Sequence, residues 1–282
     1  MTALLALLSA VLIGGADFAG GAASRLANPI RVAALAQVTG LFFAIPLSVS
    51  YGADHLSSAD ITWSALSGVA VACGFGCFYT AMGRGLISVV APLAAVTGAV
   101  IPVGYALARG ERPGTIALAG LAIAIAAVAV VSIAPAEQHA DAGAVNATVI
   151  GLSIVSGVFF GLFYITFSRI SDASGLWPVS IERSAASTVL ILLAVAFSRG
   201  PLEGIRPLLP YVFVVGLLEV AATVPLLVAL QRGPIAVASV LASLYPVTTV
   251  VLAGVVLRER LSRVQYVAVG FALVAVVLVS SG

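Results

Sequence analysis

Residues 114–134 read GTIALAGLAIAIAAVAVVSIA, an uninterrupted run without a charged side chain. An α-helix rises about 1.5 Å per residue, so about 20 mainly apolar residues cross the hydrocarbon core of a bilayer. This stretch therefore predicts one membrane-spanning helix. The polar segments 109–113 and 135–148 border it, which sets its ends.

The rest of the chain has the same character. Of its 282 residues, 61% are hydrophobic and 9% are charged, whereas soluble domains have about 45–50% and about 25%. No soluble fold of this size can bury so much apolar surface. The composition excludes a soluble enzyme, a nucleic-acid-binding protein and a large extramembrane domain. All 13 basic residues are arginine, so lysine chemistry at Schiff bases or nucleotide-binding loops is absent.

Short polar breaks divide the chain into ten apolar runs. The runs cover residues 3–22, 31–50, 61–82, 88–108, 114–134, 149–170, 178–198, 210–230, 235–257 and 264–281. We therefore expect an all-α polytopic membrane protein with ten transmembrane helices.

The two halves of the chain resemble each other. A shift of 148 residues places Arg84-Gly85 on Arg232-Gly233. The same shift places Glu111-Arg112 on Glu259-Arg260. These matches involve charged residues and glycine, which coincide by chance less often than alanine, valine and leucine. They indicate an internal duplication.

The duplication predicts a first repeat at 1–134, a loop at 135–148 and a second repeat at 149–282. Each repeat has five spans, and because five is odd the second repeat enters the membrane with the opposite orientation. Inverted repeats are typical of transporters, in which they place a solute site near the midplane and allow two access states.

The ends of the fourth and ninth spans carry the most specific motif. It reads Gly110-Glu111-Arg112-Pro113 in the first half and Arg258-Glu259-Arg260-Leu261-Ser262 in the second. On these residues the chain resembles the drug/metabolite transporter superfamily and, within it, the ten-span EamA family. The aromatic third and sixth spans look most like the YddG-type amino-acid exporters. The resemblance implies that helices 1, 3, 4, 6, 8 and 9 surround a central cavity, with 5 and 10 outside.

Ionisable residues are rare inside the predicted spans, because each costs about 2.5–3.5 kcal/mol at the helix centre. Glu219 lies near the midplane. It is either a cavity acid that contacts a substrate ammonium or carries a proton, or a structural acid bonded to a neighbouring helix. Asp17 lies late in the first span. It is either a similar cavity acid, or an acid that reaches the interface or caps a broken helix.

Glu182 and Arg183 lie in the first turns of the seventh span. Neighbouring helical residues point about 100° apart, so we expect each to find its partner elsewhere or to reach water. Arg183 could bind a substrate carboxylate, which its planar group of donors suits, or extend to the interface. Gln37 predicts an interhelical hydrogen bond.

Aromatic residues recur at helical spacing in the third and sixth spans, which is typical of packing, lipid contact or a cavity wall. We take the cavity wall to include Phe75, Phe78, Tyr79, Phe160, Tyr164 and, in the ninth span, Tyr245. Pro102 and Pro246 are candidate hinges, because proline lacks the N–H that an unbroken helix requires.

No metal-binding cluster, Ser-His pair or nucleotide-binding loop is recognisable, so we expect no enzyme, metal or cofactor. The sequence predicts a secondary transporter that exports small organic solutes, foremost neutral or aromatic amino acids, by alternating access. One alternative is drug or organic-cation efflux in exchange for protons. The other is a membrane scaffold that transports nothing.

We expect a monomer in the plasma (bacterial inner) membrane, with a small-molecule solute and membrane lipids as partners and no nucleic acid. Loops after odd-numbered spans carry eight arginines and loops after even-numbered spans carry four. The positive-inside rule then places both termini outside the cytoplasm, whereas the resemblance places both inside. We follow the resemblance.

Overall fold

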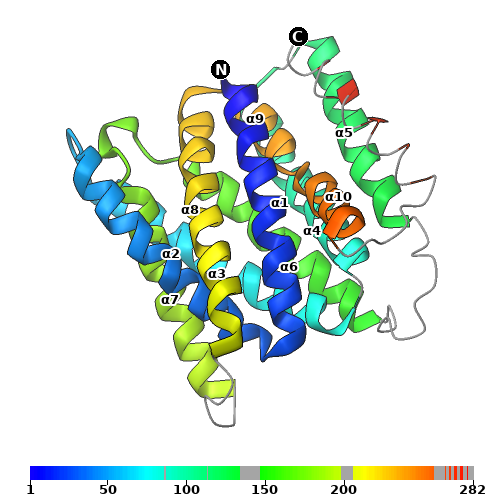
Figure 1. The fold of residues 1–282 in the computed structure, drawn as a ribbon. Coiled ribbons are helices and arrows are strands. Elements are labelled where there is room, and N and C mark those ends of the chain that lie inside the picture. The colour runs from blue at the N-terminus through cyan, green and yellow to red at the C-terminus, as the bar shows by residue number, and fades with distance from the viewer. Residues whose placement is uncertain are drawn as a thin grey trace.

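The computed structural model describes residues 1–85, 87–112, 114–133, 147–197, 206–256 and seven separate positions between 264 and 278. Within these residues the regular structure is entirely helical (Figure 1). The α-helices are α1 Thr2–Leu26, α2 Pro29–Tyr51, α3 Ser58–Arg84, α4 Ile87–Ala108, α5 Thr115–Ile133, α6 Ala147–Phe167, α7 Trp177–Phe197, α8 Leu209–Arg232, α9 Ile235–Ala242 and α10 Tyr245–Val256. Two short 3₁₀ helices, η1 Asp172–Ser174 and η2 Arg206–Leu208, lie in the loops.

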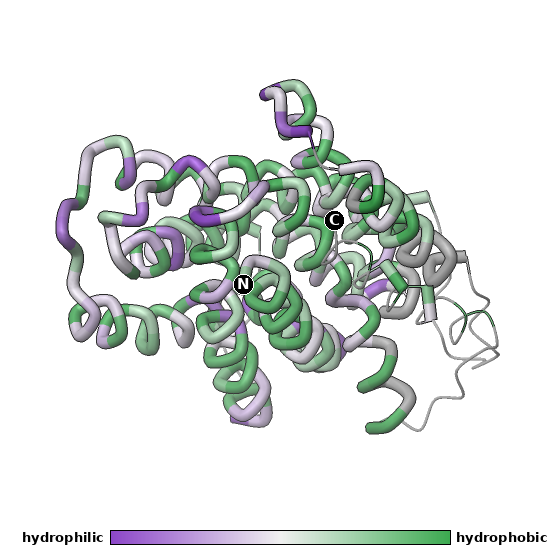
Figure 2. The backbone as a smooth tube through the Cα atoms, turned by 90° about the horizontal axis from the view of Figure 1, so that it is seen from above, coloured by the Kyte–Doolittle hydropathy of each residue, from purple (hydrophilic) through white to green (hydrophobic). Residues whose placement is uncertain are grey.

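Seven helices in the described part of the chain are long and apolar enough to cross a membrane. The prediction of a polytopic, all-helical membrane protein is therefore confirmed. Figure 2 shows hydrophobic residues along most of the helical tube, with short hydrophilic stretches between. The predicted loop at 135–148 lies outside the described residues, apart from Ala147 and Thr148 at the start of α6, and the tenth span is described only at its seven separate positions. The number of ten spans stays a prediction.

The predicted ninth span, 235–257, is not one continuous helix. Helix α9 ends at Ala242, Ser243 and Leu244 form a turn, and α10 starts at Tyr245. The cause is Pro246, which has no N–H to offer the Ala242 carbonyl and whose ring would collide with that carbonyl. Pro246 therefore lies in the first turn of α10, where proline is tolerated. Pro102, by contrast, lies inside α4.

Side chains accept hydrogen bonds from free backbone N–H groups at the starts of several helices. The Asn28 side chain accepts hydrogen bonds from the N–H groups of Ile30 and Arg31 at the start of α2. Ser57 and Asp60 form a reciprocal capping box at the start of α3. The Glu111 carboxylate, from the loop after α4, accepts hydrogen bonds from the N–H groups of Ile235 (3.1 Å) and Ala236 (3.3 Å). This last contact connects the two halves of the chain.

Small residues let the helices approach closely. A Cβ added to Gly216 of α8 would lie 2.7 Å from the backbone nitrogen of Gly40 in α2. A Cβ added to Gly68 of α3 would collide with the Glu182 carbonyl of α7. Gly68 and Gly216 are 148 residues apart, the same shift that relates the charged motifs. Such small-residue contacts are common where membrane helices pack together.

The most extensive helix–helix contacts join helices of different halves of the chain. Helix α1 packs against α8, α3 packs against α6 and α7, and α2 packs against α7 and α8. Helix α4 packs against α6, and α1 also against α9 and α10. Figure 1 shows α1 and α8 side by side, with α2 and α7 on one side of them and α4, α5 and α10 on the other. The packing leaves a cavity where the two halves meet.

Candidate functional site

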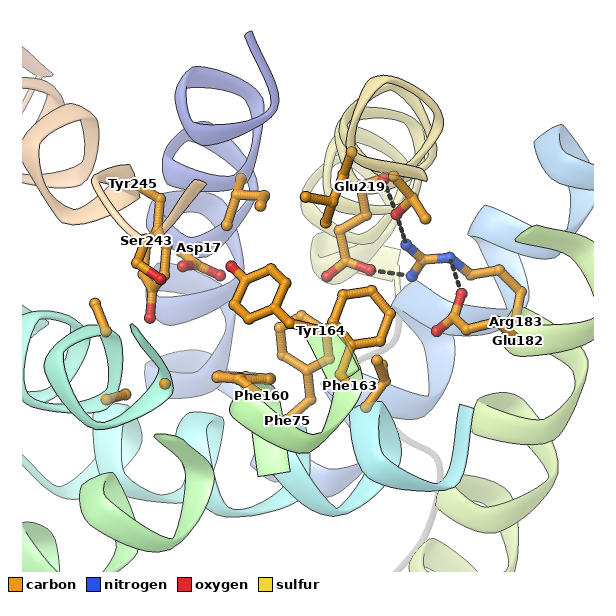
Figure 3. A pocket seen from close by; sticks show the side chains of 17 residues that line it. Asp17, Phe75, Phe160, Phe163, Tyr164, Glu182, Arg183, Glu219, Ser243 and Tyr245 are labelled. Carbon is orange, nitrogen blue, oxygen red and sulfur yellow. Dashed lines mark hydrogen bonds and ion pairs between the residues drawn. The ribbon is translucent and has the colours of Figure 1, made fainter. Parts of the chain in front are cut away.

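The cavity is partly open to its surroundings. Its walls come from α1, α3, α4, α6, α7, α8 and the segment from Ser243 to α10. The resemblance implied these helices, except that α7 also contributes to the wall. The polar side chains of the lining are Asp17, Tyr164, Glu182, Arg183, Glu219, Thr223, Ser243 and Tyr245 (Figure 3).

Arg183 lies at the centre of a buried polar cluster. Its Nη1 donates hydrogen bonds to Gln37 Oε1 at 2.6 Å and to Glu219 Oε2. Its Nη2 donates to Thr223 Oγ1 at 2.8 Å, and its Nε lies 3.3 Å from Glu182 Oε2. Gln37 Nε2 donates to Glu219 Oε2 at 3.1 Å. These five residues, called the Arg183 cluster below, join α2, α7 and α8.

The Arg183 cluster corrects one sequence-based prediction and confirms another. Glu182 and Arg183 were expected to find partners elsewhere, yet they pair with each other as well. The two side chains are long enough to bring Arg183 Nε within 3.3 Å of Glu182 Oε2 although neighbouring Cβ atoms diverge. Arg183 is only 3% exposed, so it does not extend to the membrane interface. The interhelical hydrogen bond expected of Gln37 is confirmed.

Glu219 combines both of its predicted environments. It is a buried acid bonded to neighbouring helices through Oε2, and it also lines the cavity. Its Oε1 and both oxygens of Glu182 have no hydrogen-bond partner among the described residues. The contact between Glu182 and Arg183 is an ion pair without hydrogen-bond geometry. Acceptor capacity therefore remains on the acidic side of the cluster.

Asp17 has a different environment. It is 2% exposed, lines the cavity from α1 and makes no hydrogen bond or ion pair with another described residue. Figure 3 shows Tyr164 between Asp17 and Glu219, with its hydroxyl on the side of Asp17, and Ser243 and Tyr245 close by. An unpaired charge in an apolar interior costs far more than folding can supply, so such a group is neutralised or paired. Asp17 thus neither reaches the interface nor caps a helix.

Aromatic rings form the wall between these two acidic regions. Phe75 of α3 and Phe160 of α6 meet edge to face, with ring centroids 5.2 Å apart. Phe163, Tyr164 and Tyr245 complete the aromatic part of the lining. The wall is apolar and can contact a flat, apolar solute.

Two predicted aromatic residues are absent from the lining. Phe78 packs against Phe160, with centroids 5.6 Å apart, and Tyr79 approaches Gly20 of α1 so closely that no Cβ would fit there. The Tyr79 hydroxyl is buried without a hydrogen-bond partner among the described residues. The other predicted residues, namely Asp17, Phe75, Phe160, Tyr164, Glu182, Arg183, Glu219 and Tyr245, are brought together at the cavity.

The lining also contains residues that the sequence-based prediction missed. Phe163 belongs to the aromatic stripe of the sixth span but was not selected. Thr223 and Ser243 carry no signal in the sequence, because a hydroxyl in an apolar helix usually bonds its own backbone. Both do so here, Thr223 to the Glu219 carbonyl at 2.7 Å and Ser243 to the Ser239 carbonyl at 2.8 Å.

The charges of the cavity are unequal. Three carboxylates, of Asp17, Glu182 and Glu219, share the lining with one guanidinium. Within the described ranges, no three His, Cys, Asp or Glu side chains are placed to hold a metal ion. A bundle of membrane-spanning helices around a partly open cavity with charged residues in its wall is the architecture of a membrane transporter.

The family follows from the sequence. The sequence model of the EamA-like transporter family matches residues 1–133 and 147–281, so the chain belongs to this family. It is accordingly a multi-pass membrane transporter of small solutes. The family resemblance predicted from the motifs is confirmed, whereas the likeness to YddG-type amino-acid exporters stays a prediction.

Comparison with solved structures supports the fold. One of them, described only as the crystal structure of a protein, has a TM-score of 0.75 and 16% sequence identity. The alignment covers 99% of this chain and 98% of that one. A search among curated proteins returned no match.

Proposed function

We propose that this protein is a secondary transporter that exports small organic solutes carrying an ammonium group, and that it works by alternating access through the cavity. One observation carries the proposal: three buried carboxylates face a cavity that holds one guanidinium. An ammonium compensates the excess negative charge that this lining acquires when its acids are ionised.

The aromatic wall supports a solute with an apolar or aromatic body. The Tyr164 ring lies between Asp17 and Glu219, and Phe75 and Phe160 line the wall below it (Figure 3). A ring can stack on them, which contributes about 0.5–1.5 kcal/mol beyond the burial of its area. A nearby ammonium is further attracted by the aromatic faces.

The two transport functions predicted from the sequence, export of amino acids and efflux of organic cations, differ in whether Arg183 must bind the solute. A neutral or aromatic amino acid presents a carboxylate, which Arg183 would bind through two parallel N–H groups. The Nη1 and Nη2 groups of Arg183 already donate to Gln37, Glu219 and Thr223. Its Nε faces Glu182. A second carboxylate would have to displace these acceptors or compete with Glu182 for Nε, which favours organic amines over amino acids.

One observation still favours amino acids as the second candidate. Arg183 itself lines the cavity, so a solute carboxylate could bind if it displaced Glu219 from Nη1. Transport of amines and transport of amino acids can therefore be distinguished by one chemical group of the solute, its carboxylate.

The packing of the two halves supports alternating access. Helix α1 packs against α8 as α6 packs against α3, and each pair occupies corresponding positions of the predicted repeats. Gly85 packs so closely against Val149 at the start of α6 that an added Cβ would collide with it. Gly233, 148 residues later, packs in the same way against Thr2 at the start of α1. Equivalent contacts of this kind are expected of inverted repeats, whose two halves exchange shapes between access states.

A matched pair of solutes tests the proposal. We would load purified protein into liposomes and measure counterflow of phenethylamine and of phenylalanine, which differ by the carboxylate alone. We expect exchange of phenethylamine and weaker exchange of phenylalanine. Preferred exchange of phenylalanine would instead support the amino-acid function. Exchange of neither, together with unchanged thermal stability in their presence, would refute both and favour a scaffold.

A further inference from the structure

We infer that Asp17, rather than Glu219, is the carboxylate that binds the cationic group of the solute, and that solute and proton compete for it. In this arrangement the Arg183 cluster is a fixed part of the wall. The inference rests on the proposed transport of amines and assigns the residue that determines specificity and coupling.

The first argument compares the partners of the two acids. Glu219 Oε2 accepts hydrogen bonds from Arg183 and Gln37, so its charge is already compensated in the absence of a solute. Asp17 is equally buried, and among the described residues no hydrogen bond or ion pair joins its carboxylate to a partner. A cation that enters the cavity therefore gains a full charge partner at Asp17. At Glu219 it would share the carboxylate with Arg183.

The second argument is the composition of the walls around Asp17. Helix α8 brings Glu219, α3 brings Tyr79, α6 brings Tyr164 and α10 brings Tyr245 toward it. Helices α2, α4 and α9 pack on α1 but bring no titratable side chain to the lining. These neighbours are acidic or phenolic. Arg183 of α7 is the one cation among the lining residues, and it is engaged in its cluster.

The geometry also separates the two acids in space. Figure 3 shows the Tyr164 ring between Asp17 and the Arg183 cluster, with Ser243 and Tyr245 on the side of Asp17. The Ser243 hydroxyl already donates to the Ser239 carbonyl, so its oxygen can still accept a hydrogen bond from an ammonium. Asp17, Ser243 and Tyr164 thus form a site with one charge, several acceptors and an aromatic side.

The site implies an exchange reaction. A buried carboxylate without a counter-charge must be protonated or paired with a cation. When a solute ammonium binds, the O–H bond of the Asp17 carboxylic acid breaks and the proton leaves to water. The ammonium keeps its own hydrogens and pairs with the carboxylate. One positive charge enters and one leaves, so the cavity has the same net charge in both loaded states.

Calorimetry tests this assignment. We would titrate purified protein with phenethylamine in two buffers of different ionisation enthalpy, which counts the protons released on binding. Wild-type protein should release one proton per amine. Its affinity should rise by up to about tenfold per pH unit while Asp17 is protonated, because ligand and proton compete. Asp17→Asn should lose proton release and at least tenfold in affinity.

Two further variants serve as controls. Asp17→Glu retains an exchangeable carboxylate at the site and should restore proton release, which keeps the test decisive if Asp17→Asn folds poorly. Glu219→Gln retains Asp17 and should still release a proton. Unchanged affinity and proton release in Asp17→Asn, or loss of release in Glu219→Gln alone, would overturn the assignment while leaving amine transport intact. Failure of the wild type to bind the amine would refute the proposed function itself, and this assignment with it.

Discussion

Replacing Glu219 by Gln removes one charge from the Arg183 cluster at almost constant volume. Glu219 Oε2 accepts hydrogen bonds from Arg183 Nη1 and Gln37 Nε2. The carbonyl oxygen of a glutamine can accept the same two bonds, and its amide nitrogen would replace Oε1, which has no hydrogen-bond partner among the described residues. The substitution therefore keeps the connections of the cluster and changes only their charge.

The magnitude follows from these two bonds. A hydrogen bond to a charged group contributes about 1.5–3 kcal/mol, and one between neutral groups about 0.5–1.5 kcal/mol. The bond from Gln37 becomes neutral, whereas the bond from the Arg183 guanidinium keeps a charged donor and loses only its ion-pair partner, so the substitution should cost about 1–2 kcal/mol of the free energy of unfolding. Complete loss of a buried ion-pair partner costs about 3–5 kcal/mol. That value is not reached here, because Glu182 stays 3.3 Å from Arg183 Nε.

Unfolding in detergent, followed by helical circular dichroism, measures the effect. Asp17→Asn is the matched control, since it removes a buried acid that has no such partner and should leave the stability equal or higher. Thr223→Val removes one hydrogen bond from the charged Arg183 Nη2 and should cost about 1.5–3 kcal/mol. Wild-type stability in Glu219→Gln combined with a destabilised Asp17→Asn would refute the roles assigned to the two acids.

Three further predictions concern the wall, the interrupted helix and the helix start. Tyr164→Ala should weaken binding of phenethylamine by up to about tenfold more than that of ethylamine, because stacking contributes about 0.5–1.5 kcal/mol; Tyr79→Ala, outside the lining, should lower the thermal stability and leave this ratio unchanged. Pro246→Ala restores an N–H that can bond the Ala242 carbonyl and should change the counterflow rate with unchanged equilibrium affinity; an altered affinity measured by calorimetry would contradict this. Glu111→Gln should cost about 0.5–1 kcal/mol of unfolding free energy and speed hydrogen exchange at the first amides of α9, whereas unchanged exchange would show that the cap contributes nothing.

The spans were predictable because apolar length is set by the membrane rather than by tertiary contacts. The interruption of the ninth span was not predicted, although its cause, Pro246, is visible in the sequence. A proline inside an apolar run is compatible with a kinked helix or with two helices, and packing decides between them. The hydropathy of the sequence alone does not predict how the helices pack there.

The residues of the candidate site could be predicted from the free-energy cost of placing ionisable groups in a membrane. Ionisable groups inside membrane spans are expensive, so Asp17, Glu182, Arg183 and Glu219 stood out, and all four line the cavity. Their connections could not be predicted, because they depend on how α2, α7 and α8 meet. The same limit applies to the aromatic stripe of α3, of which Phe75 alone faces the cavity while Phe78 and Tyr79 turn toward neighbouring helices.

The glycine contacts have a consequence for how such a protein can change over time. Gly68 and Gly216 set the spacing of their helices by direct backbone contact, without bulky side chains. At these two contacts the spacing of the helices is set by their backbones rather than by the side chains that face the cavity. Substitutions in the wall can alter the choice of solute while the bundle keeps its shape, and substitutions at these glycines should be eliminated whatever the solute. A fold that is retained at 16% sequence identity is the expected outcome of this separation.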